Sequence, residues 1–342
     1  MTTKTTSTSY HSLPPEILEE IREDDERFER CLEYVRDHAA GEVEGVTGPG
    51  SMSWHIFREP GILLGGLRAI LLQIAHPAVA AGVEQSSSFR NDVLGRAERT
   101  YTAMYELVFG TLHEAIGAAK RLHNIHNQVR GTVESETDSP WAGRYYRAND
   151  PTLLLWVWAT LIDTTILVYE RFLNPLTRQE KVQYYRESRI GATLMGVPPE
   201  MVPPTLDRFY DYYHGMLEGQ ELAVGDVARE QADVLFSAPY TPIQFDRILT
   251  GGILPPRFRD AYGLSWGEKE QARHRDLWSF LHLVTQLIPD TLRVVPAYHQ
   301  ARLRVALAQG KKPYLLARVV NRIDHWVNVP LSIKPIPVSS GK

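Results

Sequence analysis

The sequence is poor in cysteine: its 342 residues include only Cys31. A single cysteine excludes an internal disulfide framework and a four-cysteine zinc site, and the absence of C-x-x-C-H excludes covalently attached haem. Cys31 lies in a charge-rich segment, which argues against a buried thiolate ligand. We therefore expect the fold to be held by a hydrophobic core, for which a hydrophobic content of 43% is ample.

The chain also lacks an excess of either charge and an apolar leader. A net charge of −4 gives no reason to expect a nucleic-acid partner. The N-terminus, MTTKTTSTSYHSLPPEI, has no apolar run of the kind found in signal peptides, which predicts a polar tail and a cytoplasmic protein. The most apolar helix, 149–172, approaches the length of a membrane span, but Asp163 in its middle would be costly in lipid. We expect a buried central helix, in which Asp163 needs a partner, and no membrane span.

Alternating apolar patterns are too sparse for a sheet, whereas helical signals recur along the chain. We predict an all-α fold, a single large helical bundle. Residues 1–57 are expected to form a polar tail, a charged and mostly solvated helix, and a glycine-rich connector. Residues 58–310 would form the helical domain, and residues 311–342 a basic, proline-rich tail. Helices are expected over 15–37, 61–75, 95–109, 111–131, 149–172, 177–195, 203–218, 224–237, 243–254, 265–287 and 292–309.

The stretch 95–131 carries the strongest local signals. Thr111 and Glu114 have the T-x-x-E spacing of a capping box, and Gly131 is typical of a helix end. Between them, apolar residues recur every three or four positions and form one stripe with His126 in its middle. A lone inward histidine is more often a hydrogen-bonded core residue than a ligand.

Two chemical facts make a ligand role for His126 more competitive with a purely structural one. Imidazole is the commonest protein ligand for iron or zinc, and an inward guanidinium needs an anion or carbonyl partner. Haem offers an axial vacancy to His126 and propionates to Arg130, which lies near the edge of the stripe with His123. In the preceding helix, Arg96 and Thr100 are four residues apart and share a face. The residues expected to point away from the stripe are Lys120, Arg121, Asn124, Asn127 and Gln128.

Several segments occur in a fixed order that resembles a known family. They are REPGILLGGLRAILLQIAHPAVAAGV, GRAERTY, IHNQVRG, NDPTLLLWVWATLIDTTILVYERF, FYDYYHGMLEG, LPPRFRDAYGLSW and LIPDTLRVVPAY, over roughly residues 58–304. Together they resemble the catalytic domain shared by latex-clearing rubber oxygenases and fungal mpaB-type oxygenases. The resemblance implies an all-helical fold with a globin-like core around non-covalent haem b. It also implies cleavage of isoprenoid carbon–carbon double bonds with dioxygen.

The resemblance also assigns residues. The family's R-x-x-x-T pair falls on Arg96 and Thr100, and its proximal histidine falls on His126. Arg96, Thr100 and Arg130 would then hold propionates or polarise bound oxygen. Glu98 and Arg99 look solvated, so Arg96 and Thr100 are expected to face inward. If the helix were rotated, Arg99 would approach the iron instead.

Other residues are secondary candidates for the pocket. His76 belongs to the family's A-H-P and precedes Pro77, so it should sit at a helix end, where it caps carbonyls or projects into a cavity. Glu84 would be a general base in a dry pocket, or an exposed loop glutamate before Ser86-Ser87-Ser88. Trp158 stands where the family often has histidine, a departure that bears on substrate handling if that histidine lines the pocket elsewhere.

Two functions remain open from the sequence. The first is a haem-dependent oxygenase that acts with dioxygen on an apolar, unsaturated, isoprenoid- or lipid-like substrate. The alternative is a helical carrier or sensor that binds haem or a lipid without turnover. The sequence does not separate the two functions, because a catalytic base that abstracts an allylic proton leaves no spacing signature. A non-haem metal hydrolase is disfavoured by the missing ligand clusters. Glu270 and His274 form one E-x-x-x-H, whereas the di-iron class expects two E-x-x-H pairs.

Overall fold

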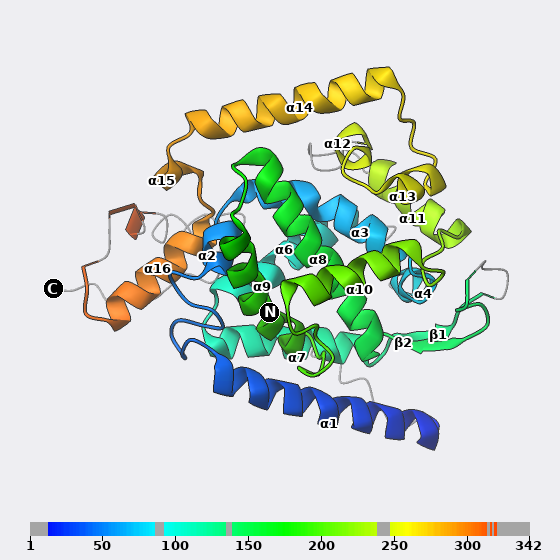
Figure 1. The fold of residues 1–342 in the computed structure, drawn as a ribbon. Helices are drawn as coiled ribbons and strands as arrows, with labels where there is room; N and C mark the ends of the chain where they lie inside the picture. The colour runs from blue at the N-terminus through cyan, green and yellow to red at the C-terminus, as the bar shows by residue number, and fades with distance from the viewer. Residues whose placement is uncertain are drawn as a thin grey trace.

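The computed structural model describes residues 13–85, 92–134, 139–237, 247–312, 315–316 and 318–319. Within these ranges the fold is all-α apart from two short strands, as the sequence predicts (Figure 1). The expected polar tail over residues 1–12, Ser86-Ser87-Ser88 and most of the C-terminal tail lie outside the described residues.

The elements follow one another along the chain as helices and one hairpin. The helices are α1 (Pro15–His38), α2 (Met52–Phe57), the 3₁₀ helix η2 (Pro60–Gly65), α3 (Gly66–Ile74), α4 (Pro77–Glu84), α6 (Val93–Phe109), α7 (Leu112–His126), α8 (Pro151–Phe172), α9 (Arg178–Leu194), α10 (Leu206–Glu218), α11 (Asp226–Ser237), α12 (Arg247–Gly251), α13 (Pro256–Ala261), α14 (Glu268–Leu287), α15 (Asp290–Arg293) and α16 (Pro296–Ala308). Strands β1 (Arg130–Thr132) and β2 (Tyr145–Arg147) pair antiparallel, with Gly131 opposite Tyr146.

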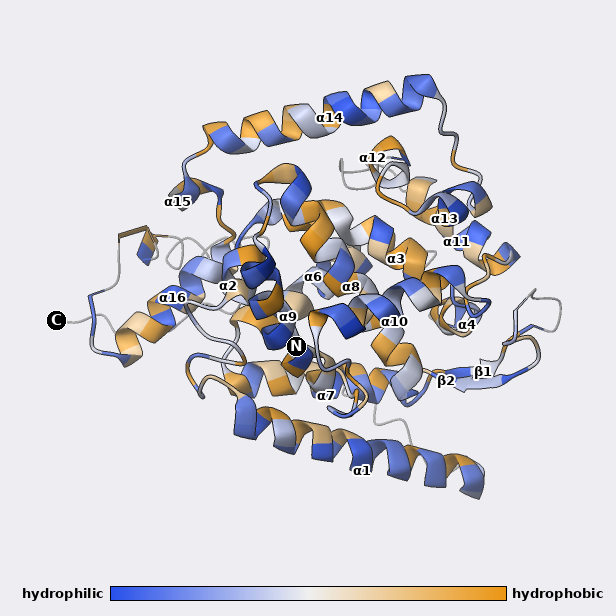
Figure 2. Ribbon diagram, in the orientation of Figure 1, coloured by the Kyte–Doolittle hydropathy of each residue, from blue (hydrophilic) through white to orange (hydrophobic). Residues whose placement is uncertain are grey.

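Helix α8 lies at the centre of the bundle. The Asp150 side chain accepts a hydrogen bond from the backbone N–H of Thr152, and Pro151 occupies the first turn, as the N-D-P signal predicts. By length and composition α8 could cross a membrane, but 72% of its most apolar window is buried inside the protein. It packs against η2, α3, α9, α10 and α14, and is mostly hydrophobic in Figure 2. The prediction of a buried central helix is confirmed.

The partner that Asp163 needs is Arg68 of α3. The guanidinium of Arg68, whose residue is only 3% exposed, donates to Asp163 Oδ2 at 2.7 Å. It also donates to the Thr164 hydroxyl, to the Tyr213 hydroxyl and to the Ile253 carbonyl. One buried cation therefore joins α3, α8, α10 and the segment after α12.

Helix α1 is exposed along most of its surface, as its charge run predicts, but one side of it is buried. Its apolar residues recur on one side and pack against α7 and α9. Asp24 is buried with them and pairs with Arg27 at 2.6 Å and Arg147 at 3.4 Å. Cys31 is buried too, and burial raises the pKa of its thiol to about 11, which keeps it protonated at neutral pH. The buried set is Ile21, Asp24, Phe28, Cys31, Leu32 and Val35.

Helices α6 and α7 form a hairpin that is covered on two sides. Thr111 and Glu114 make the expected capping box, so the start of α7 is confirmed. Helix α1 covers α7, while α16 packs against α6. From α16, Arg304 donates to the Phe109 carbonyl at 2.7 Å and to the Val43 carbonyl at 2.9 Å. Because α6 and α7 run antiparallel, the first turns of α6 lie at the same end as the last turn of α7.

Several helix ends differ from the sequence prediction. Helix α7 stops at His126, and Gly131 lies in β1 because that segment pairs with β2 instead of continuing the helix. The helix expected over 61–75 begins as a 3₁₀ turn, and the one expected over 292–309 is divided before Pro296. Of the expected 243–254 helix, residues 247–254 are described, and α12 ends at Gly251. Helices α2 and α13 are short and were not anticipated.

The Arg68 cluster predicts a large stability effect. Asp163→Ala should lower the free energy of unfolding by about 3–5 kcal/mol, because it leaves a buried guanidinium without its carboxylate. The measurement is chemical denaturation followed by circular dichroism. Asp211→Ala on α10 is the control, since Asp211 pairs with Arg208 at the exposed surface and should cost less than about 1 kcal/mol. Equal losses in the two variants would contradict the assignment.

Candidate functional site

His126 is the last residue of α7 and lies on the side that faces the bundle. Ala115 and Ala119, which precede it on that side, are buried, while His126 itself is half-buried. Burial, and then the neighbouring His123, lower the pKa of His126 to about 4, against a raising effect of the Asn149 side chain. At neutral pH the imidazole is therefore uncharged, which is the form that binds a metal.

The neighbours of His126 on α7 are more deeply buried than periodicity predicts. His123, expected at the edge of the stripe, stacks on Phe28 with ring centroids 4.1 Å apart. Its Nε2 lies 2.7 Å from Asp25 Oδ1. Asn127 was expected to point away, which is wrong: it is buried and donates to Asp25 at 2.9 Å. The cause is α1, which covers a side of α7 that the apolar pattern leaves polar.

The candidate residues on α6 lie in its first turns. Arg96 is half-buried, and burial together with the positive charge of Arg99 lowers the pKa of its guanidinium. Arg99 is exposed and pairs with Asp92 at 3.0 Å, so α6 is not rotated to bring it inward. The expectation that Thr100 faces inward is wrong, since it is exposed and its hydroxyl donates to the Arg96 carbonyl at 2.9 Å. The reason is that α6 enters the core through its second half, where Tyr105 is fully buried.

Arg130 has its anion within the protein. Its guanidinium donates to Glu20 of α1 at 3.2 Å and to the Asn127 carbonyl at 2.6 Å. These contacts hold α1 against β1 and account for the partner that the sequence left open. Glu84, by contrast, is exposed at the end of α4 and accepts from Gln231 at 3.1 Å. A general base in a dry pocket would be buried, so the structure places Glu84 in the alternative, exposed setting.

His76 lies at a helix end, as Pro77 predicts, but its side chain does not cap α4. The residue is 3% exposed, and its ring meets Trp141 edge-on with centroids 4.9 Å apart. Burial lowers the pKa of His76 to about 4, and its Nδ1 has no hydrogen-bond partner within the described ranges. His76 is therefore a neutral imidazole with one buried nitrogen that is not saturated.

Trp158 is a core residue. It is buried, its indole N–H donates to the Ser188 carbonyl at 3.2 Å, and its ring meets Phe209 edge-on. The indole thus joins α8 to α9 and α10 through packing. A histidine at this position would be too small to make the same contacts.

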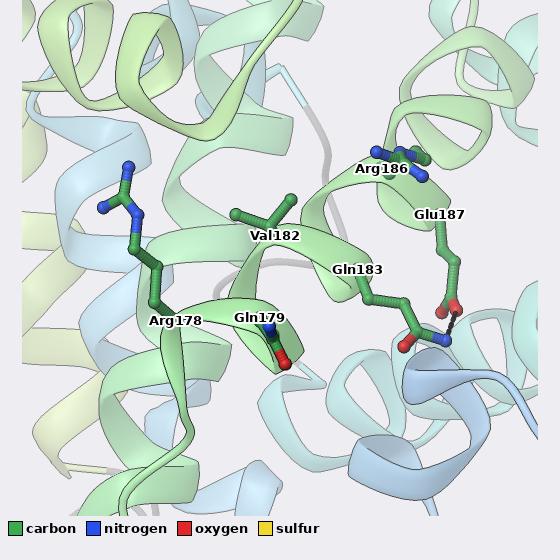
Figure 3. A pocket seen from close by; sticks show the side chains of 6 residues that line it. All are labelled: Arg178, Gln179, Val182, Gln183, Arg186 and Glu187. Carbon is green, nitrogen blue, oxygen red and sulfur yellow. Dashed lines mark hydrogen bonds between the residues drawn. The ribbon is translucent and has the colours of Figure 1, made fainter.

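Two surface hollows of the described part of the chain are lined by residues other than His126. One follows α9 and is lined by Arg178, Gln179, Val182, Gln183, Arg186 and Glu187 (Figure 3). Its acidic residue is already engaged, because Glu187 accepts from the Ser53 backbone N–H at 2.7 Å and so caps the start of α2. A second hollow lies between α8 and α10. Its lining includes Tyr210 and Asp163, the partner of Arg68.

Asn149 is a site residue that the sequence reading missed. It is 2% exposed, and its Nδ2 donates to Asn127 Oδ1 at 2.7 Å and to the His123 carbonyl at 3.2 Å. The N-D-P motif predicts only a helix start, because nothing local shows that the residue before the cap reaches α7. The signal that could have found it is the buried end of α7, which needs polar partners.

The donor set fits a haem. Within the described ranges, no three His, Cys, Asp or Glu side chains are grouped as metal ligands, whereas a haem iron needs only one axial side chain. His126 offers a neutral imidazole at the end of α7. Arg96, at the same end of the hairpin, offers a partly desolvated cation, which suits a propionate.

The comparisons with known proteins identify the family. The family described as ER-bound oxygenase mpaB/B′/Rubber oxygenase, catalytic domain, matches residues 54–285. The chain belongs to this family. It is 29% identical over 231 residues to the uncharacterized proteins Mb2261 of Mycobacterium bovis and Rv2237 of Mycobacterium tuberculosis, covering 64% of this chain and 87% of each relative. No solved structure matches significantly.

The buried His76 predicts a pH dependence of stability in this oxygenase-family protein. Its pKa falls from about 6.5 in the unfolded chain to about 4 in the folded one, so the unfolded state binds the proton first as pH falls. The contribution of His76 to the free energy of unfolding is fully present above pH 6.5 and is lost between pH 6.5 and 4. His76→Phe should reduce the loss between pH 7 and 4 by about 3 kcal/mol, measured by urea denaturation of the haem-free protein. The same pH slope in both proteins would contradict this.

Proposed function

We propose that this protein is a haem b-dependent oxygenase with His126 as the axial ligand of the iron. Membership of the oxygenase family supports the reaction class. The observation that carries the cofactor proposal is the neutral, half-buried imidazole of His126 at the end of α7, where the R-x-x-x-T and H-x-x-V-R-G segments meet. A bound haem would supply the iron at which dioxygen is activated for attack on a carbon–carbon double bond.

The residues of the chain would bind and orient that group. His126 can give its nitrogen lone pair to the iron because burial keeps the ring unprotonated at neutral pH. Arg96 would pair with a propionate, which offsets the cost of its desolvation. Thr100 is exposed, with its hydroxyl on the α6 backbone, and Arg130 is held by Glu20, so neither is assigned a direct role.

The proposed substrate is an apolar, unsaturated molecule of the isoprenoid or lipid class, with dioxygen as co-substrate. The family name supports this class, since rubber is a polyisoprene. Oxygen uptake by the haem-loaded protein with a short polyisoprenoid, together with carbonyl-ended products, tests the activity. Haem binding without oxygen uptake would favour the carrier or sensor function instead.

His126→Ala should abolish stoichiometric haem binding while the fold persists. Haem binding is lost because the variant removes the single axial side chain. The fold persists because His126 is only half-buried at a helix end, so its removal leaves no large cavity in the core. The measurement is the Soret band after reconstitution with haem, alongside the far-ultraviolet circular dichroism spectrum.

The control is His113→Ala, since His113 is exposed in the first turn of the same helix. It should bind haem like the unaltered protein. An unchanged Soret band in His126→Ala would require a different ligand, and His76 and His123 would be tested next.

Arg96→Ala should weaken haem binding by roughly ten- to a hundredfold and change the melting of the haem-free protein little. A charge-assisted contact to a buried anion is worth about 1.5–3 kcal/mol, which gives this range. Arg99→Ala is the matched control because Arg99 is exposed and bound to Asp92. Haem titration of both variants checks the result. A larger loss in Arg99→Ala would show that the cofactor lies on the other face of α6.

A further inference from the structure

The orientation of the Asn149 amide is fixed by its surroundings. Its Nδ2 faces two oxygen acceptors, the His123 carbonyl at 3.2 Å and Asn127 Oδ1 at 2.7 Å. The Asn127 oxygen is itself identified, because the Nδ2 atom of Asn127 donates to the Asp25 carboxylate at 2.9 Å. Exchanging O and N in either amide would bring oxygen against oxygen or nitrogen against nitrogen. The amide oxygen of Asn149 must therefore point away from these partners.

That oxygen lies at the end of α7, close to the His123 carbonyl and to Asn127. Asn149 Oδ1 is buried, and within the described ranges it makes no hydrogen bond of ordinary geometry. The Asn149 side chain acts on the His126 imidazole as a hydrogen-bond partner, which raises the pKa of the ring. The backbone keeps the two residues together, since Val129 N–H donates to the His126 carbonyl and Ala148 N–H donates to the Val129 carbonyl, both at 2.9 Å. A buried acceptor thus stands beside a ring that carries one N–H.

We propose that Asn149 is a positioning residue for His126: its Oδ1 accepts the imidazole N–H and leaves the lone pair on the opposite ring nitrogen. A neutral imidazole has one donor and one acceptor nitrogen, so fixing the donor fixes the atom available as a ligand. Ligating histidines generally hold their second nitrogen in this way. The statement about iron rests on the proposed function, whereas the statement about the ring does not.

The network extends from Asn149 to α1. Asp25 accepts from His123 and Asn127, and Asn127 accepts from Asn149. Arg27 of α1 donates to the Asn149 carbonyl at 2.6 Å. Side chains of α1, which lies before the family-matched region, therefore hold the residue that orients the candidate ligand.

The test compares two alanine variants. Asn149→Ala and Asn127→Ala both remove the hydrogen bond between the two amides, but only Asn149→Ala removes the oxygen beside His126. The first readout is nitrogen NMR of the histidine rings in the haem-free protein. We expect one dominant His126 tautomer in the unaltered protein and in Asn127→Ala, and a mixture in Asn149→Ala. Equal tautomer mixtures in both variants would overturn the proposal.

The second readout uses the haem-loaded protein. Asn149→Ala should weaken haem binding roughly ten- to a hundredfold and lower the iron–histidine stretching frequency, while Asn127→Ala changes both less. If the unaltered protein bound no haem, the proposed function would fail, yet the NMR result would still decide the role of Asn149. Should Asn149→Ala not fold, Asn149→Asp keeps an oxygen acceptor and should keep the tautomer of the unaltered protein. A mixture like that of free imidazole in this variant would overturn the proposal.

Discussion

The bundle depends on one buried guanidinium. Arg68 lies inside the core, where an unpaired positive charge would cost several kcal/mol, so oxygen atoms from α8, α10 and the segment after α12 have to converge on it. That requirement sets how these elements lie around α3. Apolar packing around α8 tolerates many arrangements of similar volume, whereas the donor geometry of a guanidinium tolerates few. The cluster therefore specifies the arrangement of the elements as much as it stabilises it.

The end of α7 follows the same principle with neutral groups. His126, Asn127 and Asn149 are polar side chains at the junction of a helix end, a β-hairpin and the start of α8. At this junction the Asn149 amide donates to the His123 carbonyl, and the Arg130 guanidinium donates to the Asn127 carbonyl. A polar network is compatible with burial only when nearly every member is bonded. Asn149 Oδ1 is a member of this network without a partner among the described residues, and for that reason we look to it for function.

Much of the fold could be predicted from the sequence because its signals are local. The capping box at Thr111, the N-D-P start of α8 and the all-helical class depend on residues close in the chain. The errors concern contacts between distant residues. Asn127 and Asp24 read as exposed because they are polar, and only the docking of α1 makes them buried. Gly131 reads as a helix end because its pairing with Tyr146 cannot be seen in a local pattern.

The candidate site divides in the same way. Periodicity places His126 on the inner side, and the structure agrees, but periodicity alone cannot assign a ligand. The family resemblance supplies that role and also the pairing of Arg96 with Thr100, of which only Arg96 is half-buried. The local pattern around Asn149 does not reveal its role, because its partners lie more than 20 residues away along the chain.

The cover of the α6–α7 hairpin has a consequence for how this family diversifies. The hairpin lies within the matched residues 54–285, yet α1 and α16, which clad it on two sides, lie outside them. The helices of this hairpin can thus be kept while the segments that cover them differ. In this chain α1 is rich in carboxylates. It contacts the end of α7 through Asp25, and strand β1 through Glu20. Relatives with other flanking segments would surround the same imidazole with a different electrostatic environment, and so tune one centre without altering it.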